Sequence, residues 1–438
     1  MKMHVQRRNI WLGCTAALLG SVAQLLAEDV TRPSIVGARL ERKYDFDQTN
    51  YNLKVGQVTF RATAGLRTEF NDNINLSDKD KESDIILRPQ VALSGFWPIT
   101  PYNAISLTTA FSYSKYLRHS EFDDASKSFS IAPDSELSYD IFIGHFTVNL
   151  HDRFSIDQDP NGERAGSNLK NFGQFMNTAG TSLAWDVNKL LVLTLGYDHT
   201  NAIATTSDFR FTDYTQEQLS FLLRQTLSDK LAVGLEAGWA ATKYKTDDKA
   251  DGDPYHAGVF IDAQFTDYTR LRLAGGYQGI NFNGSSAATL QIDPANKTFF
   301  AALSNDRIAA QDVNTFYVNA EFVNRLSHFF TQRLSVGKEA SLAITAQSVD
   351  VIYARYNAAW TLNQLITLNL GLFIEGGRES GALQPEDYTR YGGNVNTSLA
   401  LGRKLNAELG YNFTRKESNL DNDSYTQNVV YLGLNYTF

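Results

Sequence analysis

Cysteine is nearly absent from this sequence, whose 438 residues contain only Cys14, in an amino-terminal segment that we expect to be removed. A mature chain without thiols has no disulfide, no thiolate metal site and no cysteine nucleophile. After this segment the sequence also lacks a run of about 18 apolar residues, so no membrane-spanning helix is predicted. No glycine-rich phosphate loop stands between a strand-like and a helix-like segment, which leaves nucleotide use unsupported.

The amino-terminal segment has the parts of a secretory signal peptide. Lys2, Arg7 and Arg8 form a basic beginning, an apolar stretch follows as far as Ala27, and acidic residues come directly after it. This order predicts cleavage after Ala27. An uncleaved membrane anchor and a lipid on Cys14 are the alternatives. Loss of three cations makes the mature chain more acidic than the formal net charge of −8, which argues against nucleic acid as a partner.

Apolar residues occupy every second position at the carboxyl end of the chain. The positions between them hold small or polar residues, among them Gly433 and Asn435. This period of two predicts a strand with one apolar face and one polar face. The same alternation recurs from residue 57 onward, in segments such as 105–113, 231–239 and 404–414. The apolar positions of the last strand are Val430, Leu432, Leu434, Tyr436 and Phe438.

Short and long connections alternate between these segments. In a transmembrane β-barrel the short turns face the periplasm and the long loops face the outside. We therefore predict an all-β fold, a transmembrane antiparallel up-and-down β-barrel of about 18 strands with short periplasmic turns and long extracellular loops. A soluble β-sandwich or propeller is the alternative. The expected organisation is a signal peptide at 1–27, a periplasmic lead-in at 28–56 and an outer-membrane β-barrel at 57–438.

The first predicted hairpin carries the most specific local pattern. The run from Gly65 to Ser77 combines a glycine-containing strand with Phe70-Asn71-Asp72-Asn73-Ile74, and a second strand follows over 83–93. This hairpin resembles the outer-membrane β-barrel porin type 2 family, although Asn75 stands where members commonly have phenylalanine. The resemblance implies a barrel associated with exopolysaccharide or capsule synthesis. It also implies periplasmic polysaccharide-export proteins and polysaccharide as partners.

Strand parity predicts which side chains line the lumen. If Phe438 faces lipid, a set of arginines and carboxylates points inward, where a wet lumen tolerates charge. A network in which these charges neutralise one another is one interpretation. The other is a cationic stripe on four consecutive strands, which would favour anions or acidic sugars. The predicted lumen and substrate-path residues are Arg272, Arg325, Arg333 and Arg355 in the stripe, with Arg88, Arg153, Tyr317 and Tyr353.

The longest predicted loop runs over 282–311 and contains an apolar segment that would suit a short helix. Loops of this length are usually functional or disordered. We expect this loop to fold into the barrel as a constriction, with Phe299, Phe300 and Leu303 as candidate constriction residues. An external position for the loop is the alternative.

These observations predict an integral protein of the bacterial outer membrane that is not an enzyme and needs no cofactor or metal. Outer-membrane lipid and the barrel-assembly machinery are expected partners, with Phe438 as the assembly signal. The first functional hypothesis is a passage for polysaccharide export. A general or small-solute porin for uptake is the second, and a structural or adhesive barrel without a through-path is the third. The sequence does not indicate the oligomeric state.

Overall fold

The computed structural model describes residues 51–123, 128–157, 172–292, 299–344, 346–382, 384–421 and 423–438. Side chains are described for all of these residues except 208 and 287–307. The expected signal peptide and most of the lead-in lie outside this part of the chain. Among the described residues, no helix is long and apolar enough to cross a membrane.

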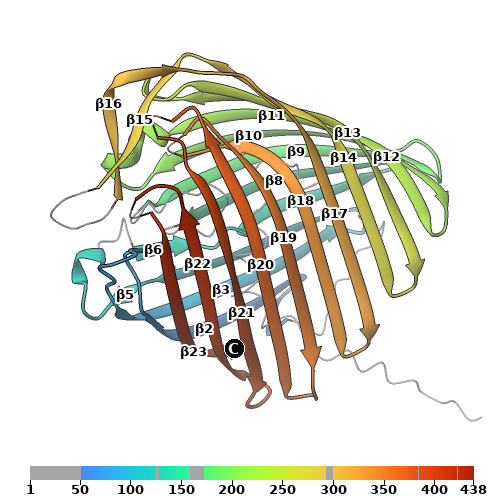
Figure 1. Cartoon of the computed structure of the whole chain (residues 1–438). Helices are drawn as coiled ribbons and strands as arrows, with labels where there is room; N and C mark the ends of the chain where they lie inside the picture. Colours follow the sequence, from blue (N-terminus) through green and yellow to red (C-terminus); the bar gives the residue numbers. More distant parts are fainter. Residues whose placement is uncertain are drawn as a thin grey trace, which may run out of the picture.

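The chain forms a closed antiparallel barrel of 18 strands, which confirms the predicted fold class (Figure 1). Each strand pairs with its neighbour in the sequence, and the last strand closes the ring by pairing with the first from Thr63–Thr437 to Asn71–Val429. The barrel strands are β2 (Val58–Asn71), β3 (Asp84–Thr100), β4 (Asn103–Tyr113), β7 (Glu136–Ile143), β8 (Phe146–Asp157), β9 (Gln174–Asp186), β10 (Leu191–Ala204), β11 (Tyr214–Ser228), β12 (Leu231–Tyr244), β13 (Asp251–Thr266), β14 (Thr269–Asn283), β17 (Val313–Ser327), β18 (Phe330–Leu342), β19 (Ser348–Thr361), β20 (Ile366–Ser380), β21 (Asp387–Ala400), β22 (Leu405–Ser418) and β23 (Tyr425–Thr437).

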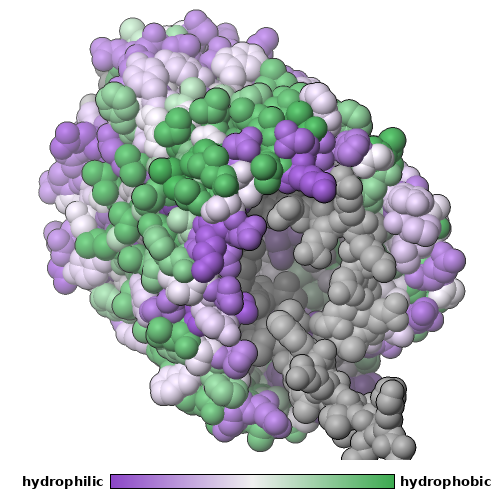
Figure 2. Space-filling model, turned by 90° about the vertical axis from the view of Figure 1, so that its right-hand side faces the viewer, coloured by the Kyte–Doolittle hydropathy of each residue, from purple (hydrophilic) through white to green (hydrophobic). Residues whose placement is uncertain are grey.

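The outer face of the barrel is apolar because every second strand residue points away from the lumen. On β23 the exposed residues are Val430, Leu432, Leu434 and Tyr436, whereas Tyr431 between them is buried. The same alternation of exposed apolar and inward polar residues is found on the other strands, as a lipid-facing barrel requires. Figure 2 shows hydrophobic side chains over the flank and hydrophilic side chains at the edge of a hollow.

Large aromatic side chains lie flat along the inner wall where the adjacent strand has a glycine. The ring of Tyr431 covers Gly410, and the ring of Phe260 covers Gly234, so closely that a Cβ at either glycine would overlap the ring. These glycines allow aromatic side chains to fill the wall without protruding into the lumen. The guanidinium of Arg67 then stacks on the Tyr431 ring at 3.6 Å from its centroid.

Smaller elements lie in the connections. They are β1 (Leu53–Val55), β5 (Lys115–Tyr116), η1 (Ser120–Phe122), β6 (Phe129–Ile131), η3 (Ser207–Thr212), β15 (Ser285–Ile292) and β16 (Phe299–Ala309). β1 pairs with the first residues of β2, so the predicted lead-in ends in a short strand. β15 and β16 form a hairpin of their own beside the long-loop end of the barrel (Figure 1).

Candidate functional site in the barrel lumen

The predicted arginines lie on the lumen side of their strands. Arg272 alternates with the exposed Leu273 on β14, and Arg355 lies on the face of β19 opposite the exposed Ile352. Parity places Arg88, Arg153, Arg325 and Arg333 inward in the same way. The four stripe arginines lie on β14, β17, β18 and β19, which are consecutive in the barrel.

Arg272 is neutralised by a neighbour two strands away. Its Nη2 atom lies 3.1 Å from Oε2 of Glu236, and its guanidinium stacks on the ring of Phe260. The hydroxyl of Tyr317 donates to Oε1 of the same carboxylate at 2.7 Å. Arg272 is therefore one member of a buried network and adds little free positive charge to the lumen.

Arg355 is held in a second network of the same kind. Glu375 lies between two guanidinium groups, with 3.6 Å to Nη2 of Arg355 and 2.7 Å to Nε of Arg390. Arg355 also stacks on the ring of Tyr353. Because the Glu375 side chain is only 1% exposed, both arginines depend on it for charge compensation.

The expected continuous cationic stripe is therefore wrong for two of its four members. Arg325 and Arg333 are exposed, and neither has an ion-pair partner within the described residues. Arg333 pairs in the sheet with Val323, and Arg325 lies two residues further toward the short turns. The uncompensated positive charge of this wall is thus confined to the end of the lumen near the short turns.

Tyr317 and Tyr353 do not present free stacking faces. They are 2% and 4% exposed, and the hydroxyl of Tyr353 accepts a hydrogen bond from the side chain of Asn319 at 2.9 Å. The ring of Tyr353 lies over Gly337 on the neighbouring strand, and the hydroxyl end of Tyr317 lies over Gly258, two strands away. Their role in this wall is packing.

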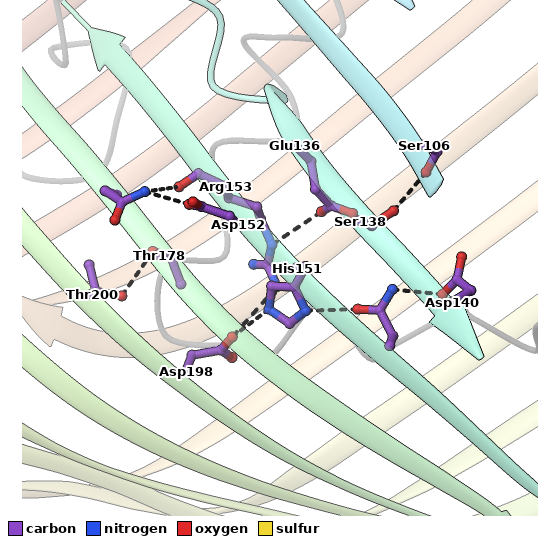
Figure 3. A network of polar contacts seen from close by, with 12 residues as sticks. Ser106, Glu136, Ser138, Asp140, His151, Asp152, Arg153, Thr178, Asp198 and Thr200 are labelled. Carbon is purple, nitrogen blue, oxygen red and sulfur yellow. Dashed lines mark hydrogen bonds and ion pairs between the residues drawn. The ribbon is translucent and has the colours of Figure 1, made fainter. Parts of the chain in front are cut away.

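Arg153 belongs to a polar network on β7, β8 and β10 (Figure 3). Its Nε atom lies 3.2 Å from Oε2 of Glu136, the residue directly opposite on β7. His151, two residues earlier, lies 2.6 Å from Oδ1 of Asp198. On the wall at the chain ends, Arg88 pairs with Glu69 at 3.4 Å, and Arg67 pairs with the same carboxylate.

The network on β8 and the network on β19 lie on opposing walls of the barrel. β8 and β19 are separated by half the ring in the strand order, so the group around His151 and Arg153 faces the group around Arg355 and Glu375. Each wall carries both signs of charge. A polar solute in the lumen would meet paired donors and acceptors on both sides rather than a field of one sign.

Loops from distant strands meet over the end of the barrel that carries the long loops. Phe172, Phe209 and Phe211 form an apolar cluster, and Ile344 from the β18–β19 connection packs against it. Phe209 and Phe211 belong to the β10–β11 connection, and β12, β13, β14 and β17 separate the two connections in the wall. The contact therefore spans a chord across the mouth.

A buried lysine joins the same two sides. The Lys249 ammonium, in the β12–β13 connection, donates hydrogen bonds to the carbonyl oxygens of Ala343 and Ile344. Burial lowers the pKa of Lys249 to about 7, partly offset by the carboxylate of Glu379. In the β20–β21 connection, burial raises the pKa of Glu386 to about 8, although the Lys416 ammonium lies 2.7 Å from it.

The predicted constriction loop has a different structure from the expected one. The segment around Phe299, Phe300 and Leu303 is a strand, β16, paired with β15, and not a short helix. The side chains of these three residues lie outside the described set, so their place in a constriction stays a prediction. The described contacts across the mouth come from Phe209, Lys249 and Ile344 instead, which no sequence pattern singled out.

Comparison with known proteins shows the fold and no more. No family model matches the chain, and no curated protein sequence matches it. Among solved structures, OccK2 (OpdF) of Pseudomonas aeruginosa has 10% identity and a TM-score of 0.50, covering 86% of this chain and 98% of that chain. The BenF-like porin of Pseudomonas fluorescens Pf-5 has 9% identity and a TM-score of 0.48, covering 86% and 99%. The outer membrane protein OpdK of P. aeruginosa gives the same identity, coverage and TM-score as the BenF-like porin.

The fold is thus the closed 18-stranded barrel that is also found in outer-membrane porins. These matches give no support to the polysaccharide-associated family that the first hairpin resembles. Their identities are too low to carry a substrate from any of these proteins to this chain.

Proposed function

We propose that this protein is an outer-membrane channel through which small polar solutes diffuse inward. This is the uptake alternative of the sequence analysis, and it replaces polysaccharide export as the preferred function. The observation that carries it is the contact across the mouth, where Ile344 packs on Phe209 and Lys249 binds the same connection. A mouth spanned in this way suits small solutes, whereas a polymer would require these contacts to break.

The lumen walls support the same function. Side chains such as those of Arg153, Glu136 and Arg88 are partly exposed and held in ion pairs, so they offer hydrogen bonds at defined positions without a strong net field. A passing solute can exchange its water for these groups in a series of weak contacts. No bond is made or broken during passage, so catalysis is not required.

The test is reconstitution of the mature protein in planar bilayers and in liposomes. We expect ion-conducting channels and liposome swelling that falls steeply as the solute grows from a monosaccharide to a polymer. Ile344→Asp places a charged side chain against the aromatic cluster. The contact across the mouth should then break, and the single-channel conductance should rise. Channels that pass or are blocked by a polyuronate while the mouth contacts are intact would favour polysaccharide passage. Absence of both conductance and swelling would favour a structural barrel.

A further inference from the structure

The barrel wall has a niche where two adjacent strands separate. β17 begins at Val313 and β18 continues to Leu342, yet their paired register ends at Val318 and Lys338. Beyond that pair the two strands diverge on the long-loop side. Tyr317 and Glu339, the next residues along each strand, line a cavity of about 40 Å³, and strand parity places both on the lumen face of the wall.

Three carboxamide side chains stand among the residues that line the niche. Gln216 and Gln218 come from β11, Gln278 from β14 and His256 from β13. All three glutamines and Glu339 are at least nine-tenths buried. Gln216 is fixed in orientation because its Nε2 donates to Oγ1 of Thr242 at 2.8 Å.

One amide in the niche is unsatisfied. Nε2 of Gln278 is buried and has no hydrogen-bond partner among the described residues. Buried polar atoms in folded proteins are normally paired, with protein, water or ligand. The cavity beside Gln278 is large enough for one or two water molecules or for a polar group of a solute.

The chemistry of the lining selects a class of solute. Carboxamides both donate and accept, Glu339 accepts, and neither lysine nor arginine lines the cavity. An anion would find no cation there. Adjacent hydroxyl groups, each of which also donates and accepts, match amides in both directions. We propose that the niche formed by Gln216, Gln218, Gln278 and Glu339 binds hydroxyl groups of a neutral, polyhydroxylated solute of the sugar class.

This proposal rests on the proposed function, because the glutamines and Glu339 belong to the lumen face of the wall along which solutes would pass. The size of the niche means that it holds one polar end of the solute at a time. Such a site is weak, which suits a channel, since tight binding would hold the solute in place.

Binding can be measured apart from transport. Isothermal titration calorimetry of the full chain in detergent measures glucose binding. Gln278→Leu should weaken glucose about tenfold, as expected for the loss of one hydrogen bond. Gln90→Leu is the matched control, because Gln90 is a lumen glutamine on β3 whose amide donates to Asn435 at 2.7 Å. That control should bind glucose as the wild type does.

The outcomes separate the two proposals. Equal glucose affinity in wild type, Gln278→Leu and Gln90→Leu would overturn the niche, as would tighter binding of gluconate or glucosamine than of glucose. Conductance without glucose binding would leave the channel function standing and remove the niche. Glucose binding lost only in Gln278→Leu, in a protein that does not conduct, would keep the niche and remove the channel function. Circular dichroism and heat-modifiable migration verify that each variant is folded.

Discussion

The side-chain ammonium of Lys249 lies 3.1 Å from the carbonyl oxygen of Ile344, although the two residues belong to connections on different sides of the barrel mouth. A second hydrogen bond reaches the adjacent carbonyl of Ala343. The ring of Tyr244 lies 4.7 Å from the same ammonium, and Glu379 is the carboxylate that acts on it. The contact is buried, so its strength depends on the charge of Lys249.

This contact should make the mouth sensitive to pH. The pKa of Lys249 is lowered from 10.5 to about 7 in the closed mouth. Between these values the open form binds more protons than the closed form, so closure gains stability as pH rises from about 7 toward 10. The open-to-closed ratio should fall by up to about tenfold per pH unit in that window. Single-channel recordings at pH 7 to 9 would measure it.

Lys249→Met provides the control for that measurement. The variant keeps the apolar stem and removes the titrating amine, so closure should no longer gain stability as pH rises through the window. It also leaves two carbonyl oxygens unpaired, which should raise the basal open fraction. Glu386→Gln removes a carboxyl of the β20–β21 connection whose pKa is raised to about 8, so this variant shows how much of the pH dependence comes from Glu386. An unchanged pH slope in Lys249→Met would show that another group controls the mouth.

Anion preference should depend on two arginines rather than four. Arg325 and Arg333 are exposed to the lumen without an ion-pair partner in the described part of the chain, whereas Arg272 and Arg355 are paired. Arg325→Gln with Arg333→Gln should lower the chloride-to-sodium permeability ratio by about two- to four-fold, the effect of two screened charges about 10 Å from a passing ion. Reversal potentials across a salt gradient give this ratio.

Arg378→Gln is the matched control for charge removal. Arg378 is 76% exposed on the outer side of β20, where it pairs with Asp387 at 2.9 Å. Its loss should leave the reversal potential as in the wild type. If the double variant also leaves it unchanged, the exposed arginines do not select ions.

The period of two in the sequence was sufficient to predict the strands and their lumen faces. Successive side chains along a strand point to opposite faces of the sheet. With Phe438 taken as lipid-facing, this alternation places Arg272 and Glu236 inward without a structure. Their pairing could not be predicted, because it requires the register of three strands and the closure of the sheet. The mouth contacts of Lys249 and Ile344 depend on the closed ring in the same way, and no sequence pattern marks them.

Glu375 should be essential to the stability of its wall. Its carboxylate lies between Arg355 and Arg390, and all three side chains are at most 9% exposed. Glu375→Gln leaves two buried cations near each other, so the free energy of unfolding should fall by about 3 kcal/mol. Urea unfolding in detergent micelles, followed by tryptophan fluorescence, would measure this change. Asp387→Asn, which removes an exposed partner of Arg378, should change stability by less than about 0.5 kcal/mol.

Gly410 should be intolerant of any side chain because of Tyr431. A Cβ at residue 410 would overlap the Tyr431 ring, whose hydroxyl donates to Glu408 at 3.0 Å and whose face carries Arg67. Gly410→Ala should therefore displace the ring and destabilise the barrel by about 1–3 kcal/mol. Tyr431→Leu should cost less in the Gly410→Ala background than in the wild type, since the ring is already displaced there. A double-mutant cycle on heat-modifiable migration and urea unfolding measures this coupling, and strictly additive losses would show that the ring does not depend on the glycine.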